Sequence, residues 1–525
     1  MDTAVQEAEI RRRRTFAIIS HPDAGKTTLT EKFLLYGGAI QLAGHVRAKK
    51  ERRATRSDWM EIEKERGISV SSTALQFEYR GMVFNLLDTP GHQDFSEDTY
   101  RTLMAADSAI MVLDAAKGVE PQTRKLFAIC RERGIPILTF INKMDRPARD
   151  PFDLLDEVEK VLGITAVPVV WPMGSGELFR GFYDILDDSV HWFDKSAGGK
   201  FRAPVAMTGI DDPKIMELLG SEEHASFREG IELSRGALPS FDRDLYLAGQ
   251  MSPVFFGSAV NNFGIELLLT RYAELAPSPR PTRLHGGGEL PIVGSFSGFV
   301  FKLQANMNKA HRDRVAFIRI TSGAFERGMS VAVPRLGREV KLSSPVAFFG
   351  QDRNVIDTAY AGDVIGLINP GLYRIGDVLA EGNVPDFKPL PMFAPEMFAR
   401  VVCTDTQKMK QFRKGVEELI QEGVIQVFNP TDHAPILGAV GNLQFEVFVY
   451  RLDAEYGAPA RLESMPYKLS RWVRPADLGV FGAYDKLVKD IDGHDVVLFE
   501  SDFRLRTFRD KHPKVLLAEH PGDLQ

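Results

Sequence analysis

A run of small and polar residues close to the N-terminus has the types and spacing that bind a phosphate chain. Small residues let backbone N–H groups point at phosphate oxygens, and a lysine supplies positive charge for the β- and γ-phosphates. The hydroxyl of the threonine after that lysine is a suitable ligand for Mg²⁺. The run consists of Ser20, His21, Pro22, Asp23, Ala24, Gly25, Lys26 and Thr27, followed by Thr28. It matches the phosphate-loop pattern with serine at the first glycine position, although a loose match of this kind also occurs in ordinary strand-to-helix turns.

A second group of chemically suitable residues follows the apolar run 83–87. It consists of Asp88, Thr89, Pro90 and Gly91, with His92 directly after it. We expect Asp88 to contribute to a magnesium site and the N–H of Gly91 to reach the γ-phosphate. The imidazole of His92 would then lie near the attacking water. Alone this pattern is a common turn, but after a phosphate loop it predicts nucleotide hydrolysis.

A third group indicates which base is bound. Asn142, Lys143, Met144 and Asp145 come at the end of another apolar run. The Asp145 carboxylate can accept hydrogen bonds from N1–H and the exocyclic amine of guanine, whereas adenine presents an acceptor at N1 and leaves the carboxylate unpaired. Asn142 can bond the base edge and neighbouring loops, and the stem of Lys143 can cover the ring. After the run 253–257, Ser258 and Ala259 could offer a backbone N–H to guanine O6. The ligands predicted are therefore GTP and GDP, with Mg²⁺.

The elements around these motifs predict a doubly wound, mostly parallel sheet. Short and nearly continuous apolar runs are typical of strands that are buried on both faces. Helix-like stretches follow the first four of them, and ligands bind such sheets at the carboxyl ends of the strands, where the motifs fall. The runs are 15–20, 83–88, 109–114, 136–141 and 253–257. We expect residues 1–280 to form a GTP-binding domain with an insertion at about 160–250.

The rest of the chain predicts two further domains of a multi-domain α/β protein. A linker rich in proline and glycine at 276–291 precedes short runs of β type, which favour a β-barrel domain at 281–388. A second proline-rich linker lies at 385–395. A strand, a helix, two strands and a helix then indicate a C-terminal α+β domain at 389–525. Its tail has two candidate strands, 496–499 and 515–518.

The composition limits which binding partners and which cellular compartment we expect for this chain. The 525 residues carry 65 basic and 71 acidic side chains, a net charge of −6, so bulk charge does not favour nucleic acid binding. One local basic cluster stands out, which is either a solvated loop or a contact with phosphate. It contains Arg47, Lys49, Lys50, Arg52, Arg53 and Arg56. Two distant cysteines, Cys130 and Cys403, argue against a disulfide framework and fit a reducing cytoplasm. No run is long enough to span a membrane.

Several of these motifs resemble those of the translational GTPases, and the barrel resembles the second domain of that family. The resemblance covers about the first 460 residues and is carried by residues 21–28, 58–61, 65–69 and 88–92. Ser69 in place of the more usual threonine, the chain length and the run 441–447 point to the class II release factors. The resemblance implies that 37–72 is switch I and 88–102 is switch II. Ser69 would join Thr27 and Asp88 as a magnesium ligand, and Pro22 and Ile68 would flank the catalytic His92.

The resemblance also implies a function in translation termination. The chain would hydrolyse GTP to GDP and phosphate on the ribosome, whose RNA and proteins would be its partners, and an rRNA phosphate would fix His92 against the water. It would thereby promote the dissociation of class I release factors after peptide release. It would act as a monomer in the cytoplasm. Two alternatives are a shortened elongation-type GTPase and a scaffold that senses GTP or GDP without useful turnover. His92, Thr27 and Ser69 together argue against the scaffold, because a sensor needs no group that positions water.

Overall fold

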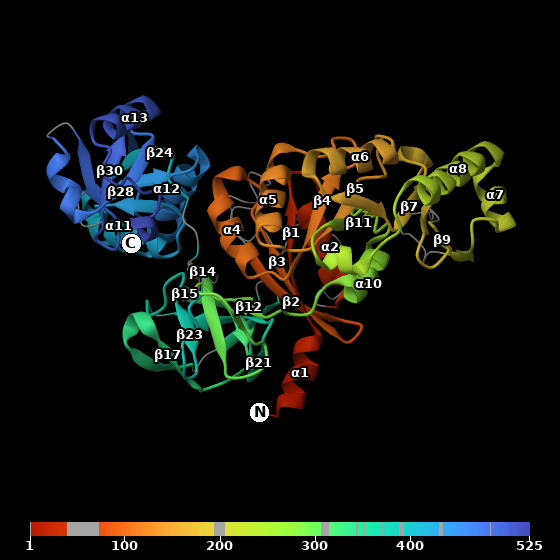
Figure 1. Cartoon of the computed structure of the whole chain (residues 1–525), viewed down its shortest axis with the longest axis horizontal. Coiled ribbons are helices and arrows are strands. Elements are labelled where there is room, and N and C mark those ends of the chain that lie inside the picture. Colours follow the sequence, from red (N-terminus) through yellow and green to blue (C-terminus); the bar gives the residue numbers. More distant parts are fainter. Residues whose placement is uncertain are drawn as a thin grey trace.

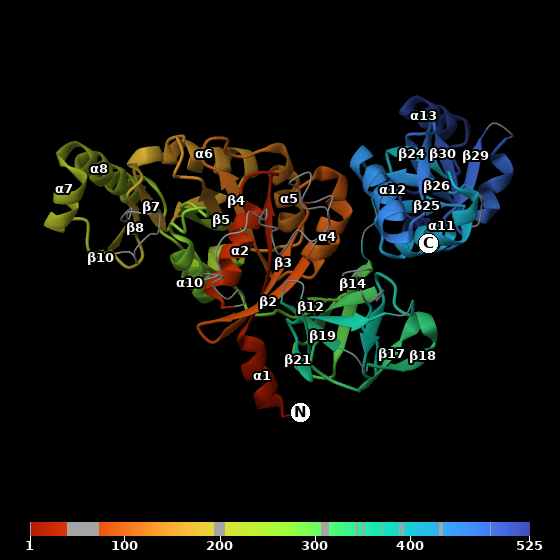
Figure 2. The same ribbon diagram turned by 180° about the vertical axis from the view of Figure 1, so that it is seen from behind.

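The computed structural model has three parts that follow one another along the chain (Figure 1). It describes residues 2–38, 73–193, 205–305, 314–342, 345–349, 352–369, 371–387, 390, 393–429, 434–482 and 485–524. Ser69, Ile68 and the basic cluster 47–56 lie outside the described residues. The C-terminal part lies at one end of the molecule and the insertion of the first part at the other, as both views show (Figures 1 and 2).

The first part is built on a seven-stranded sheet with the order β2-β3-β1-β4-β5-β11-β6. All neighbouring strands are parallel except β2 and β3. Every residue of β1, β4 and β5 is buried, as the continuous apolar runs predict. The strands are β1 (Arg13–Ser20), β2 (Thr73–Tyr79), β3 (Met82–Asp88), β4 (Ser108–Asp114), β5 (Ile137–Asn142), β6 (Thr165–Pro168) and β11 (Met251–Phe256).

Helices accompany this sheet in the alternation expected of a doubly wound fold. The helices are α1 (Thr3–Arg11), α2 (Lys26–Tyr36), α4 (Ser96–Met104), α5 (Pro121–Glu132), α6 (Pro151–Leu162), α9 (Arg243–Leu247) and α10 (Ile265–Leu275). A short 3-10 turn, η1 (Gln93–Phe95), precedes α4.

The insertion has a small sheet of its own, with the antiparallel order β10-β9-β8-β7. Its elements are β7 (Val170–Met173), β8 (Gly181–Asp184), β9 (Ser189–Trp192), β10 (Val205–Thr208), α7 (Pro213–Leu219) and α8 (Ser221–Ala237). Strand β6 falls inside the range 160–250 yet pairs in parallel with β11 of the main sheet. An edge strand of four residues carries too little pattern to be recognised from the sequence.

The second part is the expected β-barrel domain, with an eight-stranded order β18-β17-β23-β14-β15-β22-β19-β20. These strands are β14 (Ser297–Ala305), β15 (Arg314–Ser322), β17 (Ser330–Val333), β18 (Arg338–Lys341), β19 (Pro345–Phe349), β20 (Asp352–Val355), β22 (Val364–Ile368) and β23 (Val378–Ala380). Two small ladders complete it: β12 (Thr282–Arg283) with β13 (Glu289–Leu290), and β16 (Ala324–Glu326) with β21 (Thr358–Tyr360).

The third part contains two sheets. The first has the order β25-β26-β24-β27 and is covered by two helices; the second has the order β28-β30-β29. The predicted strand at 515–518 is wrong, because only an isolated bridge joins Ala518 to Trp472. The elements are β24 (Met397–Cys403), α11 (Met409–Gln421), β25 (Gln426–Phe428), β26 (Ile436–Ala439), α12 (Asn442–Tyr456), β27 (Ala460–Ser464), β28 (Leu469–Val473), β29 (Lys486–Lys489), β30 (Asp495–Phe499) and α13 (Asp502–Lys511).

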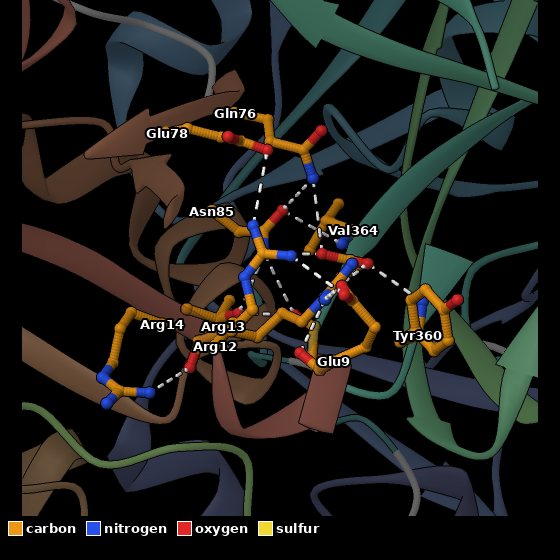
Figure 3. A network of polar contacts seen from close by, with 12 residues as sticks. Glu9, Arg12, Arg13, Arg14, Gln76, Glu78, Asn85, Tyr360 and Val364 are labelled. Atoms are coloured by element: carbon orange, nitrogen blue, oxygen red, sulfur yellow. Dashed lines mark hydrogen bonds and ion pairs between the residues drawn. The ribbon is translucent and has the colours of Figure 1, made fainter. Parts of the chain in front are cut away.

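A buried polar network joins the barrel to the first part (Figure 3). Arg13, at the start of β1, donates from Nε to Asp363 Oδ2 at 3.1 Å and also pairs with Glu9 of α1. Asn85 Nδ2 donates to Asp363 Oδ1 at 3.1 Å. Because a buried carboxylate without partners is costly, these contacts fix the barrel against the amino end of β1. That end is opposite the strand ends that carry the nucleotide motifs.

Candidate nucleotide-binding site

The loop between β1 and α2 has the backbone geometry of a phosphate site. Gly25 precedes α2 with φ 101° and provides no side-chain cap, so the first N–H groups of the helix are left to face a ligand. A Cβ at Gly25 would lie 2.2 Å from Asn142 Nδ2. Glycine is therefore required here both by the left-handed backbone and by the close approach of a second loop.

Three loops and Gly91 meet around one cavity of about 390 Å³. Its lining residues are Ser20, His21, Pro22, Asp23, Gly25, Lys26, Thr27, Thr28, Gly91, Asn142, Lys143, Asp145, Arg146, Ser258 and Val260. The structure thus brings most of the sequence-predicted nucleotide residues to one place at the carboxyl ends of β1, β5 and β11. Arg146 and Val260 were missed by the sequence reasoning. Their adjacency to Asp145 and Ala259 is the only signal that could have found them.

The remaining predicted residues do not line the cavity. They are Ala24, Asp88, Thr89, Pro90, His92, Met144 and Ala259. The Met144 side chain is 1% exposed and packs in the core, so only its backbone could serve a ligand. The Thr89 hydroxyl donates to the carbonyl of Ile18 at 2.7 Å, which holds the end of β3 against β1. These residues shape the loops that surround the cavity.

Asn142 ties two of these loops to the end of β5. Its Nδ2 donates to the carbonyl of Ala24 at 2.8 Å, and its Oδ1 accepts from the N–H of Ala259 at 2.9 Å. Asn142 is 1% exposed. One amide therefore satisfies a donor and an acceptor that would otherwise be buried without partners, and it sets the spacing between the phosphate loop and the predicted base site.

Lys26 and Asp88 face each other at the phosphate end of the site. Lys26 Nζ lies 2.6 Å from Asp88 Oδ1, and both side chains are buried. Thr27 lines the cavity beside them. A hydroxyl and a carboxylate are oxygen donors of the kind that Mg²⁺ prefers, so Thr27 and Asp88 fit a magnesium site. Among the described residues the buried Ser20 hydroxyl has no hydrogen-bond partner, which fits an anionic ligand above the loop.

Lys143 is held by a second ion pair, at the predicted base end of the cavity. Its backbone is left-handed, with φ 72°, and its Nζ donates to Asp114 Oδ2 at 2.8 Å. Burial alone would raise the pKa of Asp114, but hydrogen bonds from Lys143 and from the Ala116 N–H hold it below its ordinary value. Asp114 thus remains a carboxylate at neutral pH and fixes the lysine across this end of the cavity. Asp145 lies in the same loop and lines the cavity.

His92 follows Gly91 but lies beside the cavity. Its side chain is 33% exposed and its Nδ1 is 3.2 Å from Asp94 Oδ1. The ring also packs edge-on against Phe95, with 6.5 Å between centroids. The structure therefore places the predicted catalytic histidine next to the site, with the Asp94 carboxylate on its Nδ1.

The fold and the site define the chain as a translational GTPase. The GTP-binding domain model of elongation factor Tu matches residues 11–278, and the model of elongation factor G domain 2 matches residues 295–382. The model for the C-terminal domain of the class II release factor RF3 matches residues 387–509. The multi-domain fold that the sequence predicts is confirmed by these matches.

Similar proteins narrow the class further. The chain is 54% identical over 515 residues to peptide chain release factor 3 of Symbiobacterium thermophilum, with 97% of each chain covered. It is 51% identical over 527 residues to peptide chain release factor 3 of Gloeobacter violaceus, with 99% of each chain covered. The chain belongs to the peptide chain release factor 3 family. The predictions of guanine nucleotide binding, GTP hydrolysis and a role in translation termination are thereby confirmed.

A solved structure supports the fold alone. A crystal structure of a protein from Thermus thermophilus matches with a TM-score of 0.69 and 22% identity, over 91% of this chain and 72% of that one. Across the described part of the chain, no helix is long and apolar enough to cross a membrane.

Proposed function

We propose that this protein binds GTP at the cavity described above, hydrolyses it on the ribosome and thereby promotes the dissociation of class I release factors after peptide release. The observation that carries the proposal is the convergence of the phosphate loop, Gly91, the Asn142–Asp145 loop and Ser258 on one cavity in a member of this family. The partners proposed are ribosomal RNA and proteins and the class I release factors. The protein acts in the cytoplasm, as a monomer.

We assign the residues at and beside the cavity, and Ser69 outside the described residues, distinct roles in binding. The N–H groups at the start of α2 and the Lys26 ammonium hold the β- and γ-phosphates. The Asp145 carboxylate selects guanine, and Lys143 covers the base with its stem. Thr27 and Asp88 would hold Mg²⁺, which supplies positive charge to the phosphate oxygens when bound. Ser69 is proposed as its third protein ligand.

Hydrolysis requires a group that orients water at the γ-phosphate, and we assign this role to His92. The N–H of Gly91 can reach the phosphate without hindrance, so the next side chain is the one nearest to the attacking water. His92 acts once the ribosome has moved it from its place beside the cavity toward that water. The loss of such a positioned group slows catalysis while leaving ground-state binding intact.

A comparison of GTP turnover with and without ribosomes tests the proposal. Ribosomes that carry a labelled class I release factor should stimulate hydrolysis, and the label should leave the ribosome only when GTP is supplied. Equal turnover with and without ribosomes would contradict the proposal. A shortened elongation-type factor would be stimulated by ribosomes without releasing the label, and a scaffold would bind GTP without turnover in either condition.

A further inference from the structure

Helix α12 of the C-terminal part is capped by a residue of switch II. The helix begins after Gly441, which has no side chain and makes no capping bond of its own. Instead, Asp94 Oδ2 accepts a hydrogen bond from the N–H of Leu443 at 2.8 Å. Aspartate normally supplies this bond from the N-cap position of the same helix. Here the carboxylate comes from a different domain, and α12 lies next to α4 in both views (Figures 1 and 2).

The fit between Asp94 and the start of α12 is tight. Asp94 is 6% exposed. A Cβ added at Gly441 would lie 2.1 Å from the Asp94 carboxyl carbon. Gly441 has φ −150° and ψ 166°, an extended backbone that any residue adopts. Glycine is therefore needed at this position because Asp94 approaches it, and the backbone conformation sets no such requirement.

The Asp94 carboxylate also contacts His92, the residue that we propose orients the attacking water. Asp94 Oδ1 lies 3.2 Å from His92 Nδ1, and the Asp94 N–H donates to that nitrogen at 3.3 Å. Asp94 thus presents an acceptor and a donor to one ring nitrogen, and it can hold the ring whether or not Nδ1 carries a proton. In this arrangement His92 does not line the nucleotide cavity.

A second contact beside the cap holds the two domains together. Arg101 of α4 pairs with Glu97 and donates to the carbonyl of Gly423 at 3.4 Å. Tyr100 packs edge-on against Phe393, with 5.8 Å between ring centroids. Residues 94–101 of switch II, which include most of α4, therefore form one continuous docking surface for the C-terminal part, with Asp94 at the end nearest the nucleotide.

We propose that Asp94 is a positioning residue that couples the docking of the C-terminal part to the orientation of His92. While Asp94 caps α12, it restrains His92 beside the cavity and keeps hydrolysis slow in the absence of the ribosome. Loss of the cap frees Asp94 and His92 together, and the ring can then turn toward the γ-phosphate. This inference rests on the proposed catalytic role of His92.

Gly441→Ala is the most selective test, because it displaces the cap while leaving both Asp94 and His92 in place. Gly479→Ala is the matched control in the same part of the chain, since a Cβ there would meet nothing within 4 Å. Hydrogen–deuterium exchange of the peptide that contains Leu443 reports the cap directly. Single-turnover GTP hydrolysis without ribosomes, with enough excess protein to bind all of the GTP, reports the restraint on His92.

We expect Gly441→Ala to lose exchange protection at Leu443 and to hydrolyse GTP about fivefold faster or more, the lower end of typical coupling between sites. GTP affinity should stay unchanged, and Gly479→Ala should behave as wild type. In an Asp94→Ala background, Gly441→Ala should have no further effect on either measurement, because the group with which it clashes is gone. Adding His92→Ala to Gly441→Ala should abolish the acceleration.

Three results would overturn the proposal: protection retained in Gly441→Ala, protection lost with no change in rate, or protection lost with slower hydrolysis. These three results can be told apart from a failure of the proposed catalytic role of His92. In that case His92→Ala alone would leave ribosome-stimulated hydrolysis at the wild-type rate, whereas the exchange data would still report the bond between Asp94 and Leu443.

Discussion

The substitution Asn142→Ala removes the amide that joins the phosphate loop to the loop after β11. Both of its partners, the carbonyl of Ala24 and the N–H of Ala259, belong to residues that are at most 1% exposed. A buried polar group left without a partner costs about 1–3 kcal/mol, so two of them cost about 2–6 kcal/mol.

Access of water to the site lowers this free-energy cost. Asn142 lines the nucleotide cavity, so water can enter the space that the shortened side chain leaves and satisfy part of the lost bonding. We therefore expect about 2–3 kcal/mol. The free protein can relieve this cost by loosening the loops, but a bound nucleotide needs them ordered. The cost should consequently appear in binding, as a loss of about 30- to 150-fold in GDP affinity.

Isothermal titration with GDP measures this effect, beside circular dichroism to show that the fold is kept. Asn383→Ala is the matched control, because Asn383 lies in an exposed bend of the barrel domain. Its affinity for GDP should equal that of the wild type. An Asn142→Ala variant that binds GDP within about threefold of the wild type would refute the view that this amide organises the site.

Other substitutions test the remaining parts of the site. Asp145→Asn should shift preference from guanine toward xanthine nucleotides, because the amide donates to the second carbonyl of xanthine; equal GTP binding by variant and wild type in competition would remove Asp145 from the base site. Lys26→Ala should abolish tight binding of fluorescent GDP and lower the melting temperature, since Asp88 loses the ammonium 2.6 Å away; wild-type binding would contradict the phosphate role. His92→Ala should leave GTP binding nearly unchanged and slow ribosome-stimulated hydrolysis by roughly 10²–10⁴-fold in single-turnover assays; binding and stability that fall together would point to a structural histidine instead. Burial raises the pKa of Cys130 to about 12, so its thiol should resist alkylation at pH 8 until the protein is unfolded, as mass spectrometry would show.

The sequence by itself determined the nucleotide motifs and the strands that carry them. Residues 20–28 and 142–145 are local patterns of neighbouring residues in the chain, so their roles can be predicted without a structure. The strands β1, β4 and β5 were predictable because strands buried on both faces must be continuously apolar. Short strands such as β6 and β27 were missed, because four or five residues show no reliable periodicity.

Only the tertiary structure decided how distant residues share a function. Asn142 meets the carbonyl of Ala24 across 118 residues, and Asp94 meets the N–H of Leu443 across 349. Gly441 stands out in the sequence only as the first residue of the run 441–447, and Asp94 as one acid among many. Their contact arises because the C-terminal part packs on the turn η1, where the Asp94 carboxylate satisfies a helix N-terminus that the helix's own N-cap residue leaves without a side-chain bond.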